Sequence, residues 1–221
     1  MAPEPPGDVP AMLNGEMSSG VTPTAAPLFV ATDGSVRKRI IAGSAWLASS
    51  GEYGLDAVRH STKMHGSAVV LVAEVRAIGA AVRKLCGRDM TIYSDNAAAV
   101  ELVNRWMDGH DVLPKRYPAY RESGKTPGLV RIRHTIYEHR DQITVHWVKG
   151  HSGEPLNEGA HRLARLASRF KLRDGTLNRD EYRCRAEDLA DTYSREFNRR
   201  RTGDAQLTGG QAPHTTLGIG S

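Results

Sequence analysis

The stretch WVKGHSGEPLNEGAHRLARLA, residues 147–167, constrains the fold more than any other part of the chain. Apolar residues alternate with polar ones over 143–147, which indicates a short strand, and a glycine-rich polar loop follows it. Apolar residues then recur at every third or fourth position, as in a helix that is buried on one side. These positions are Leu163, Leu166, Ala167 and Phe170. The stretch therefore predicts a strand that leads through a loop into a helix.

Polar residues gather at this strand-to-helix junction. His151 lies between two glycines of the loop. Asn157 is the expected N-cap of the helix, because its side-chain oxygen can accept a hydrogen bond from an amide of the first turn. Glu158 and His161 follow, and we expect His161 in the first turn, off the leucine stripe. Two histidines and a carboxylate that converge at one junction are typical of a functional site.

The rest of the chain predicts an α/β domain. Three strands at 27–35, 40–49 and 53–60 would form an antiparallel meander. Strands and helices then alternate, with an irregular, exposed segment at 108–128 before the last of them. The pattern predicts a mixed sheet of five strands flanked by helices. The further elements are helices at 67–85, 96–107 and 129–140 and strands at 91–95 and 143–148.

The length and the composition set the domain organisation. A chain of 221 residues suits one domain with tails. We predict a disordered tail at 1–26, a domain at 27–171, a charged helical extension at 172–200 and a second disordered tail at 201–221. Apolar residues in the extension mark one face of a helix, but they identify no protein partner.

Several classes of protein are disfavoured by the composition. The two cysteines, Cys86 and Cys184, are far apart, so neither a disulfide framework nor a zinc ribbon is expected. No stretch approaches 18 apolar residues and no leader pattern opens the chain, so we expect a cytoplasmic monomer with no membrane association. The net charge of +5 is compatible with a polyanionic partner but is weak evidence for one.

Three acidic residues carry the second candidate feature. Asp33 and Asp95 each end a predicted strand, and Glu74 lies in the middle of a mostly apolar helix. Each has an ordinary interpretation on its own, as a turn residue, a helix cap or a solvated helix residue. Three carboxylates held together repel one another unless they are protonated or bridged by cations, and hard divalent ions prefer oxygen ligands. Two such ions are the clamp used in phosphodiester hydrolysis.

These motifs together resemble the type 1 ribonuclease H family. The matching pieces are TDGS at 32–35, VAEVRAI at 72–78, YSDNAAAV at 93–100 and VKGHSGEPLNEGA at 148–160. The last piece matches the Gly-His-x-Gly-x-x-x-Asn-Glu pattern of the family residue for residue. The resemblance implies a ribonuclease H-like fold and hydrolysis of the RNA strand of an RNA–DNA hybrid. It also implies two Mg²⁺ or Mn²⁺ ions in the site.

The resemblance also implies a role for each site residue. Asp33, Glu74 and Asp95 correspond to three of the four metal-binding acids, His151 to the histidine that assists proton movement or product release, and Glu158 to an accessory carboxylate.

The fourth acid of the family is replaced by His161. Imidazole ligates Mn²⁺ more readily than Mg²⁺, and the helix N-terminus would hold the histidine neutral. His161 is therefore either a metal ligand or a bystander.

A basic segment at 114–133 matches the family's substrate-binding handle in position. It holds six basic side chains and one acid, although a merely solvated run of charge remains the alternative. The family's RNA-contacting turn after the first strand is missing here, so the side chains that read the 2′-hydroxyls are not identified, and Asn96 is the best candidate. The expected nucleic-acid contacts are Ser35, Asn96, Lys115, Arg116, Arg121, Lys125 and Asn157.

Two functions follow from these patterns. The first is a hybrid-cleaving endonuclease, favoured by the joint presence of the three acids, His151 and Glu158. The alternative is an inactive nucleic-acid-binding module on the same fold, because the fourth acid is absent.

Overall fold

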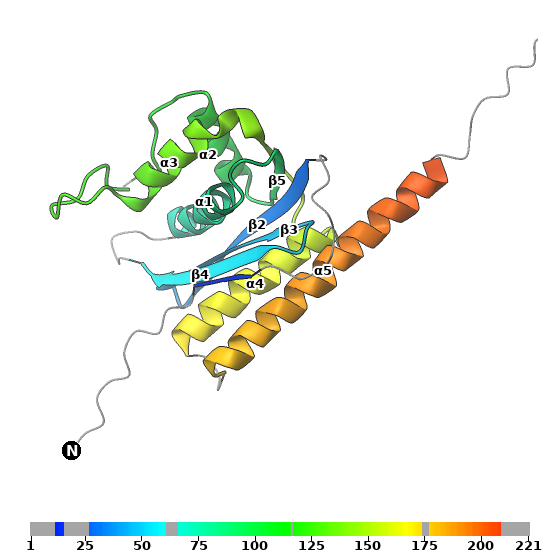
Figure 1. Ribbon diagram of the computed structural model, residues 1–221. Helices are drawn as coiled ribbons and strands as arrows, with labels where there is room; N and C mark the ends of the chain where they lie inside the picture. The colour runs from blue at the N-terminus through cyan, green and yellow to red at the C-terminus, as the bar shows by residue number, and fades with distance from the viewer. Residues whose placement is uncertain (1–11, 16–26, 61–65, 116, 174–176, 209–221) are drawn as a thin grey trace, which may run out of the picture.

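The computed structural model describes residues 12–15, 27–60, 66–115, 117–173 and 177–208. Their centre is one mixed sheet in the order β1-β4-β3-β2-β5-β6, with helices on both faces (Figure 1). The predicted class, a mixed α/β domain, is confirmed, but the sheet has six strands instead of five. The strands are β1 (Leu13–Gly15), β2 (Leu28–Arg37), β3 (Ile41–Ala48), β4 (Tyr53–Arg59), β5 (Met90–Ser94) and β6 (Ile143–Trp147).

The predicted antiparallel meander is formed by β2, β3 and β4. Strand β3 is buried along its whole length because helices cover both of its faces. Its small residues allow this close approach, and a Cβ atom at Gly43 would collide with the backbone of Ala164. The tight turn between β3 and β4 has Gly51 at φ 87°, a conformation that glycine adopts without strain.

Five helices form the two outer layers. Helices α1 (Ser67–Lys84), α2 (Ala97–Met107) and α3 (Gly128–Glu138) lie on one face, and α4 (Pro155–Leu172) and α5 (Arg179–Thr208) lie on the other (Figure 1). Each layer has its own apolar core. A short 3₁₀ turn, η1 (Arg140–Gln142), leads into β6. The extension is part of the domain, because Tyr182 of α5 is fully buried and stacks on Phe170 of α4 with ring centroids 4.0 Å apart.

The parallel strands β2, β5 and β6 fix the edge where the candidate residues gather. Thr32 pairs with Ser94, and Ser94 pairs with Trp147. The residues that follow Thr32 and Ser94, which are Asp33 and Asp95, therefore lie side by side at the same end of the sheet.

Three sequence predictions need correction. Residues 13–15, predicted to be disordered, pair with β4 as strand β1. Helix α5 extends to Thr208, eight residues past the predicted end of the helix. Helix α4 begins at Pro155, and its N-cap is Glu154, whose carboxylate accepts a hydrogen bond of 2.7 Å from the amide of Asn157. The remaining predicted tail residues, 1–11, 16–26 and 209–221, lie outside the described residues.

The described helices include none that combines the length and the apolarity needed to span a lipid bilayer.

Candidate active site

Three elements deliver one carboxylate each to the same place. Asp33 comes from β2, Glu74 from the middle of α1, and Asp95 from the residue directly after β5. One oxygen of each carboxylate lies within 4.8 Å of the others. Asp33 and Glu74 are each 3% exposed. The sequence prediction that these three residues converge is therefore matched by the geometry.

The local sequence explains why the three acids can approach. The pairing of Thr32 with Ser94 makes the next residues of the two parallel strands, Asp33 and Asp95, neighbours. Helix α1 packs against β2 at Gly34, where a Cβ atom would collide with the backbone of Glu74. On the other side, a Cβ atom at Gly150 would collide with the Asp95 carboxylate. Glycine at these positions leaves room for the carboxylates to gather.

Burial and mutual repulsion make this cluster electrostatically unbalanced. Burial, and to a smaller extent the nearby Asp33 and Asp95, together raise the pKa of Glu74 to about 9. Burial also raises the pKa of Asp33, although its hydrogen bond with His161 opposes the change. Among the described residues, the buried Oδ2 of Asp33 has no hydrogen-bond partner. A divalent cation would balance the charge and satisfy this oxygen, so the donor set fits a metal that prefers oxygen ligands.

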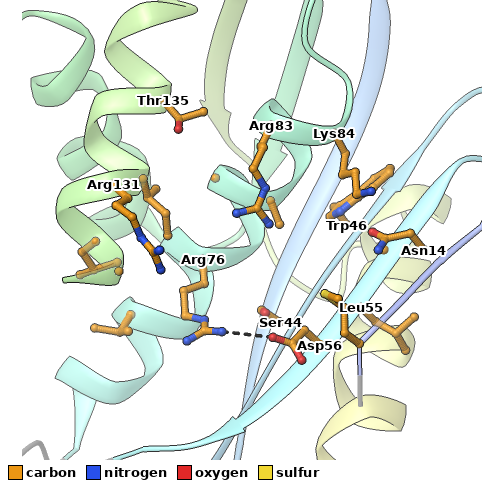
Figure 2. Close-up of a pocket in the computed structure, with 18 of the residues that line it drawn as sticks. Asn14, Ser44, Trp46, Leu55, Asp56, Arg76, Arg83, Lys84, Arg131 and Thr135 are labelled. Carbon is orange, nitrogen blue, oxygen red and sulfur yellow. Dashed lines mark hydrogen bonds and ion pairs between the residues drawn. The ribbon is translucent and has the colours of Figure 1, made fainter. Parts of the chain in front are cut away.

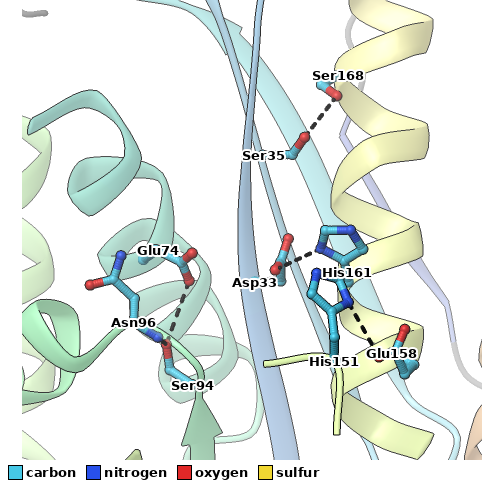
Figure 3. A network of polar contacts seen from close by, with 9 residues as sticks. All are labelled: Asp33, Ser35, Glu74, Ser94, Asn96, His151, Glu158, His161 and Ser168. Atoms are coloured by element: carbon cyan, nitrogen blue, oxygen red, sulfur yellow. Dashed lines mark hydrogen bonds and ion pairs between the residues drawn. The ribbon is translucent and has the colours of Figure 1, made fainter. Parts of the chain in front are cut away.

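His161 lies against the acidic cluster on the α4 side (Figure 3). Its Nδ1 is 3.1 Å from Oδ1 of Asp33, and its side chain is 25% exposed. The hydrogen bond to Asp33 raises the pKa of His161, and burial of the ring opposes this effect. Two sequence predictions are corrected here. His161 was expected in the first turn of the helix but lies in the second turn of α4. It was expected to be held neutral, but its contact with Asp33 favours the protonated form.

His151 and Glu158 complete the group (Figure 3). The Nδ1 of His151 is 3.5 Å from a carboxylate oxygen of Glu158, and the imidazole rings of His151 and His161 meet edge to face with centroids 5.0 Å apart. His151 has a positive φ of 54°, in a loop that joins β6 to α4. The exposed His151 side chain can therefore exchange protons with solvent and with Glu158.

The predicted nucleic-acid contacts are in different surroundings. The hydroxyl of Ser35 is 3.4 Å from that of Ser168 on α4. Asn96 caps α2 by accepting a hydrogen bond of 3.0 Å from the amide of Ala99. Asn157 is only 3% exposed, and its contact with nucleic acid stays a prediction.

The basic segment runs from the loop after α2 into the first part of α3. Its side chains at Lys115, Arg121 and Lys125 are exposed, and Arg116 lies outside the described residues. The backbone here is mostly irregular, as predicted, although Pro114 and Pro127 are buried. The hydroxyl of Tyr117 accepts a hydrogen bond of 3.1 Å from the Leu129 amide, which anchors the segment to the start of α3.

Sequence reasoning missed several residues that support the site. The Ser94 hydroxyl lies 3.5 Å from the Glu74 carboxylate, and the Trp147 indole donates a hydrogen bond of 3.0 Å to the Asp95 carbonyl. Arg200 of α5 donates a hydrogen bond of 2.8 Å to the carbonyl of Gly153, in the His151 loop. The position of Ser94 directly before Asp95 was a weak sequence signal of its supporting role, but nothing near Arg200 in the sequence indicates such a role.

One cavity is separate from the acidic cluster. It has a volume of about 360 Å³ and lies between α1, α3 and the β4 side of the sheet (Figure 2). Arg76, which pairs with Asp56 at 3.2 Å, lines it together with Arg83, Lys84 and Arg131. None of the three clustered acids lines this cavity.

Comparisons with known proteins agree with these observations. The family model described as RNase H matches residues 25–169. A protein named Ribonuclease H from Rhizobium johnstonii is 30% identical over 100 residues, which cover 43% of this chain and 60% of the relative. A Ribonuclease H from Agrobacterium fabrum is 32% identical over 95 residues, which cover 43% of this chain and 62% of the relative. The matches thus span about three fifths of these relatives' length.

A solved structure is also similar. It is the N-terminal RNase H domain of rv2228c from Mycobacterium tuberculosis, fused to maltose binding protein. The match has 20% sequence identity and a TM-score of 0.46, and it covers 68% of this chain and 99% of that chain.

Proposed function

This chain belongs to the RNase H family, and we propose that it is an endonuclease that hydrolyses the RNA strand of RNA–DNA hybrids at the acidic cluster. The observation that carries the proposal is the convergence of Asp33, Glu74 and Asp95 with carboxylate oxygens within 4.8 Å of one another. Two of these three residues, Asp33 and Glu74, are buried. Such a cluster is unfavourable as three free anions and becomes favourable when it binds cations.

We propose that these acids hold two divalent ions, Mg²⁺ or Mn²⁺. When bound, such ions activate water as the nucleophile and stabilise the charge on the leaving oxygen of the phosphodiester. The unpartnered Oδ2 of Asp33 and the raised pKa of Glu74 support a cation at this point. The glycines at 34 and 150 keep the space beside the carboxylates free of side-chain atoms.

The histidine side of the site supplies proton transfer in this proposal. His151 is exposed, has a carboxylate partner 3.5 Å away in Glu158, and lies on a loop beside the acids. It accepts a proton at one stage and returns it to solvent or to the departing strand at another, and Glu158 stabilises its charged form. In this proposal His161 stands in for the family's fourth acid, and its Nδ1, 3.1 Å from Oδ1 of Asp33, would be a ligand or a hydrogen-bond donor if the site held cations.

Substrate binding in the proposal uses the basic segment. Lys115, Arg121 and Lys125 contact phosphates of the hybrid, and their exposure leaves them free to do so. Asn96, which directly follows Asp95, contacts the RNA strand beside the acidic cluster in this proposal.

A cleavage assay tests the proposal. The full chain should cut the RNA strand of an end-labelled RNA–DNA hybrid in Mg²⁺ or Mn²⁺, and it should leave single-stranded RNA and duplex DNA of the same sequence intact. Chelation with EDTA should abolish the cleavage. The alternative, an inactive nucleic-acid-binding module, predicts hybrid binding with no cleavage in either metal, and that result would overturn the proposal.

A further inference from the structure

Among the described residues, no helix covers one face of the sheet beside the site. Helix α4 packs on β2, β3 and β4, whereas β5 and β6 lie beyond it. Because side chains alternate along a strand, the apolar residues of β5 and β6 enter the α1 side core and the residues between them face the α4 side. Thr144 and His146 on this face are exposed, and Thr91 and Tyr93 are half-buried.

Aromatic rings run across this face from strand to strand. The Arg201 guanidinium of α5 lies 4.1 Å from the ring centroid of Phe29 on β2. The Phe29 and Tyr93 rings are nearly parallel, at an interplanar angle of 6° with centroids 6.3 Å apart. The rings of Tyr93 and His146 follow at 6.1 Å. We call Phe29, Tyr93 and His146 the aromatic strip.

Packing of α5 explains only one end of this strip. Phe29 contacts Phe197 of α5, with centroids 5.7 Å apart, and lies under Arg201. Tyr93 and His146 have no ring contact or hydrogen bond with α5 among the described residues. Packing against α5 therefore explains the aromatic residue on β2, but it does not explain the aromatic residues on β5 and on the edge strand β6.

The charge of α5 is divided along the helix. Its first part, 179–191, carries three arginines and five acids, whereas 195–201 carries four arginines and one acid. That acid, Glu196, is already paired with Arg199 and Arg200. The positive end of α5 is the part beside Phe29, and in Figure 1 it continues past the sheet. The strip residues themselves carry no acidic side chain.

Aromatic faces, threonine hydroxyls and nearby arginines suit one class of ligand. Bases of a single strand stack on aromatic side chains, and arginines bind the phosphates between them. A protein partner with an acidic surface would use the arginines but would not require a row of rings.

From this arrangement we infer that the aromatic strip and the arginines at 195–201 bind single-stranded RNA that continues from the hybrid held in the active site. The inference rests on the proposed function for its choice of strand. Tyr93 is in β5, two residues before Asp95, and His146 precedes Trp147, whose indole donates to the Asp95 carbonyl. The RNA strand is the one that the proposed reaction brings to Asp95, so its unpaired continuation reaches the strip first.

Binding without divalent metal tests the inference separately from cleavage. The full chain is titrated with a blunt hybrid, with the same hybrid extended by single-stranded RNA at either RNA end, and with DNA extensions of the same sequence. Stacking of one or two bases should make one RNA-extended hybrid bind roughly tenfold more tightly than the blunt hybrid. The variant Tyr93→Leu/His146→Ala should reduce this gain to about twofold or less.

Three further variants make the test specific. Arg201→Ala should lower the gain, whereas Tyr137→Leu and Arg83→Ala, which remove an exposed ring from α3 and an exposed charge from α1, should leave it unchanged. Equal gains with DNA extensions, or a full gain in Tyr93→Leu/His146→Ala, would overturn the inference. Cleavage of the blunt hybrid in metal reports on the proposed function alone, so the failure of either idea is visible without the other.

Discussion

The acidic half and the histidine half of the site lie in contact, yet they are built in different ways. Asp33, Glu74 and Asp95 come from three separate elements, and the first two are almost fully buried. His161 and Glu158 share one helix, and the His151 side chain, on the adjoining loop, is 71% exposed. The acidic half cannot balance its own charge, whereas each histidine has a carboxylate within 3.5 Å. We therefore expect the acidic half to determine whether cations bind and the histidine half to modify how they bind.

Removal of one carboxylate should have the largest effect. Asp33→Asn and Asp95→Asn should each lower the cleavage rate by on the order of 10²–10³-fold or more, because a cation loses a charged ligand. The fold should survive, because each substitution also relieves repulsion between buried anions. Single-turnover cleavage of a labelled hybrid measures the first effect, and circular dichroism checks the second.

The control for these variants is Asp141→Asn, which removes an exposed acid of η1 far from the cluster in the fold. It should cleave at the rate of the unmodified protein. Full activity in both active-site variants would show that the acids are not the reacting centre.

The charge imbalance of the acidic half should also appear as pH-dependent stability of the metal-free protein. The pKa of Glu74 is about 9 in the fold against 4.5 in its absence. Between these pH values the folded state keeps a proton that the unfolded chain releases, so the free energy of unfolding should fall as pH rises. The total loss should be a few kcal/mol, measured by urea unfolding in EDTA at several pH values.

Glu74→Gln is the matched variant, since it keeps the shape and cannot ionise. Its stability should change much less over the same range of pH, and added Mn²⁺ should restore the stability of the unmodified protein at high pH. An equally steep pH dependence in Glu74→Gln would assign the effect to other groups.

A change at His161 tests whether the histidine half tunes the metal. His161→Asp adds a fourth carboxylate beside Asp33, so cations should bind roughly tenfold more tightly and activity in Mg²⁺ should rise. The low-pH limb of activity should move down, because the new group stays ionised at lower pH than imidazole. His161→Ala should instead weaken Mn²⁺ binding if the imidazole is a ligand.

Metal titrations of activity, in Mg²⁺ and Mn²⁺ separately, measure both substitutions. His134→Asp, at an exposed position of α3, controls for the added charge. An unchanged metal dependence in both His161 variants would identify His161 as a bystander.

The two halves also differ in how well the sequence predicted them. Asp33 and Asp95 were predictable because each follows a short apolar run, and the parallel pairing of Thr32 with Ser94 brings them together, although β2 continues past Asp33 to Arg37. The start of α4 was not predictable, because both Glu154 and Asn157 can serve as the N-cap. In the structure Glu154 is the N-cap, and Pro155 follows it in the first helical turn. The burial of Asn157 follows from this shift of the helix start.

Other parts of the fold depend on contacts between distant segments. Strand β1 has only three residues, too few for a periodic pattern, and it forms by pairing with β4. Residues 201–208 at the end of α5 lack an apolar pattern, and the ion pairs Arg195–Asp191 and Arg200–Glu196 stabilise the helical turns directly before them. Sequence reasoning that looks for apolar periodicity therefore ended the helix too early.

Substrate affinity should depend on neither half of the site but on the basic segment. Replacing Lys115 and Arg121 by alanine should weaken hybrid binding several-fold at moderate salt, because fewer counterions are released. The slope of log affinity against log salt should decrease by roughly 0.9 for each lost phosphate contact. Arg83→Ala/Lys84→Ala removes two exposed charges from the end of α1 and should leave the slope unchanged. An equal change of slope in both pairs would indicate only the effect of net charge.

The smallest effect is expected where α5 contacts the histidine half. Arg200 donates a hydrogen bond to the Gly153 carbonyl and pairs with Glu196, and its side chain is 52% exposed. One exposed hydrogen bond contributes about 1 kcal/mol or less, so Arg200→Ala should lower the cleavage rate by about two- to fivefold and loosen the His151 loop. Arg199→Ala is the matched control, because Arg199 shares Glu196 but makes no described contact with the loop. Hydrogen exchange of residues 149–153 should increase in Arg200→Ala alone, and equal exchange in both variants would show that α5 does not hold the loop.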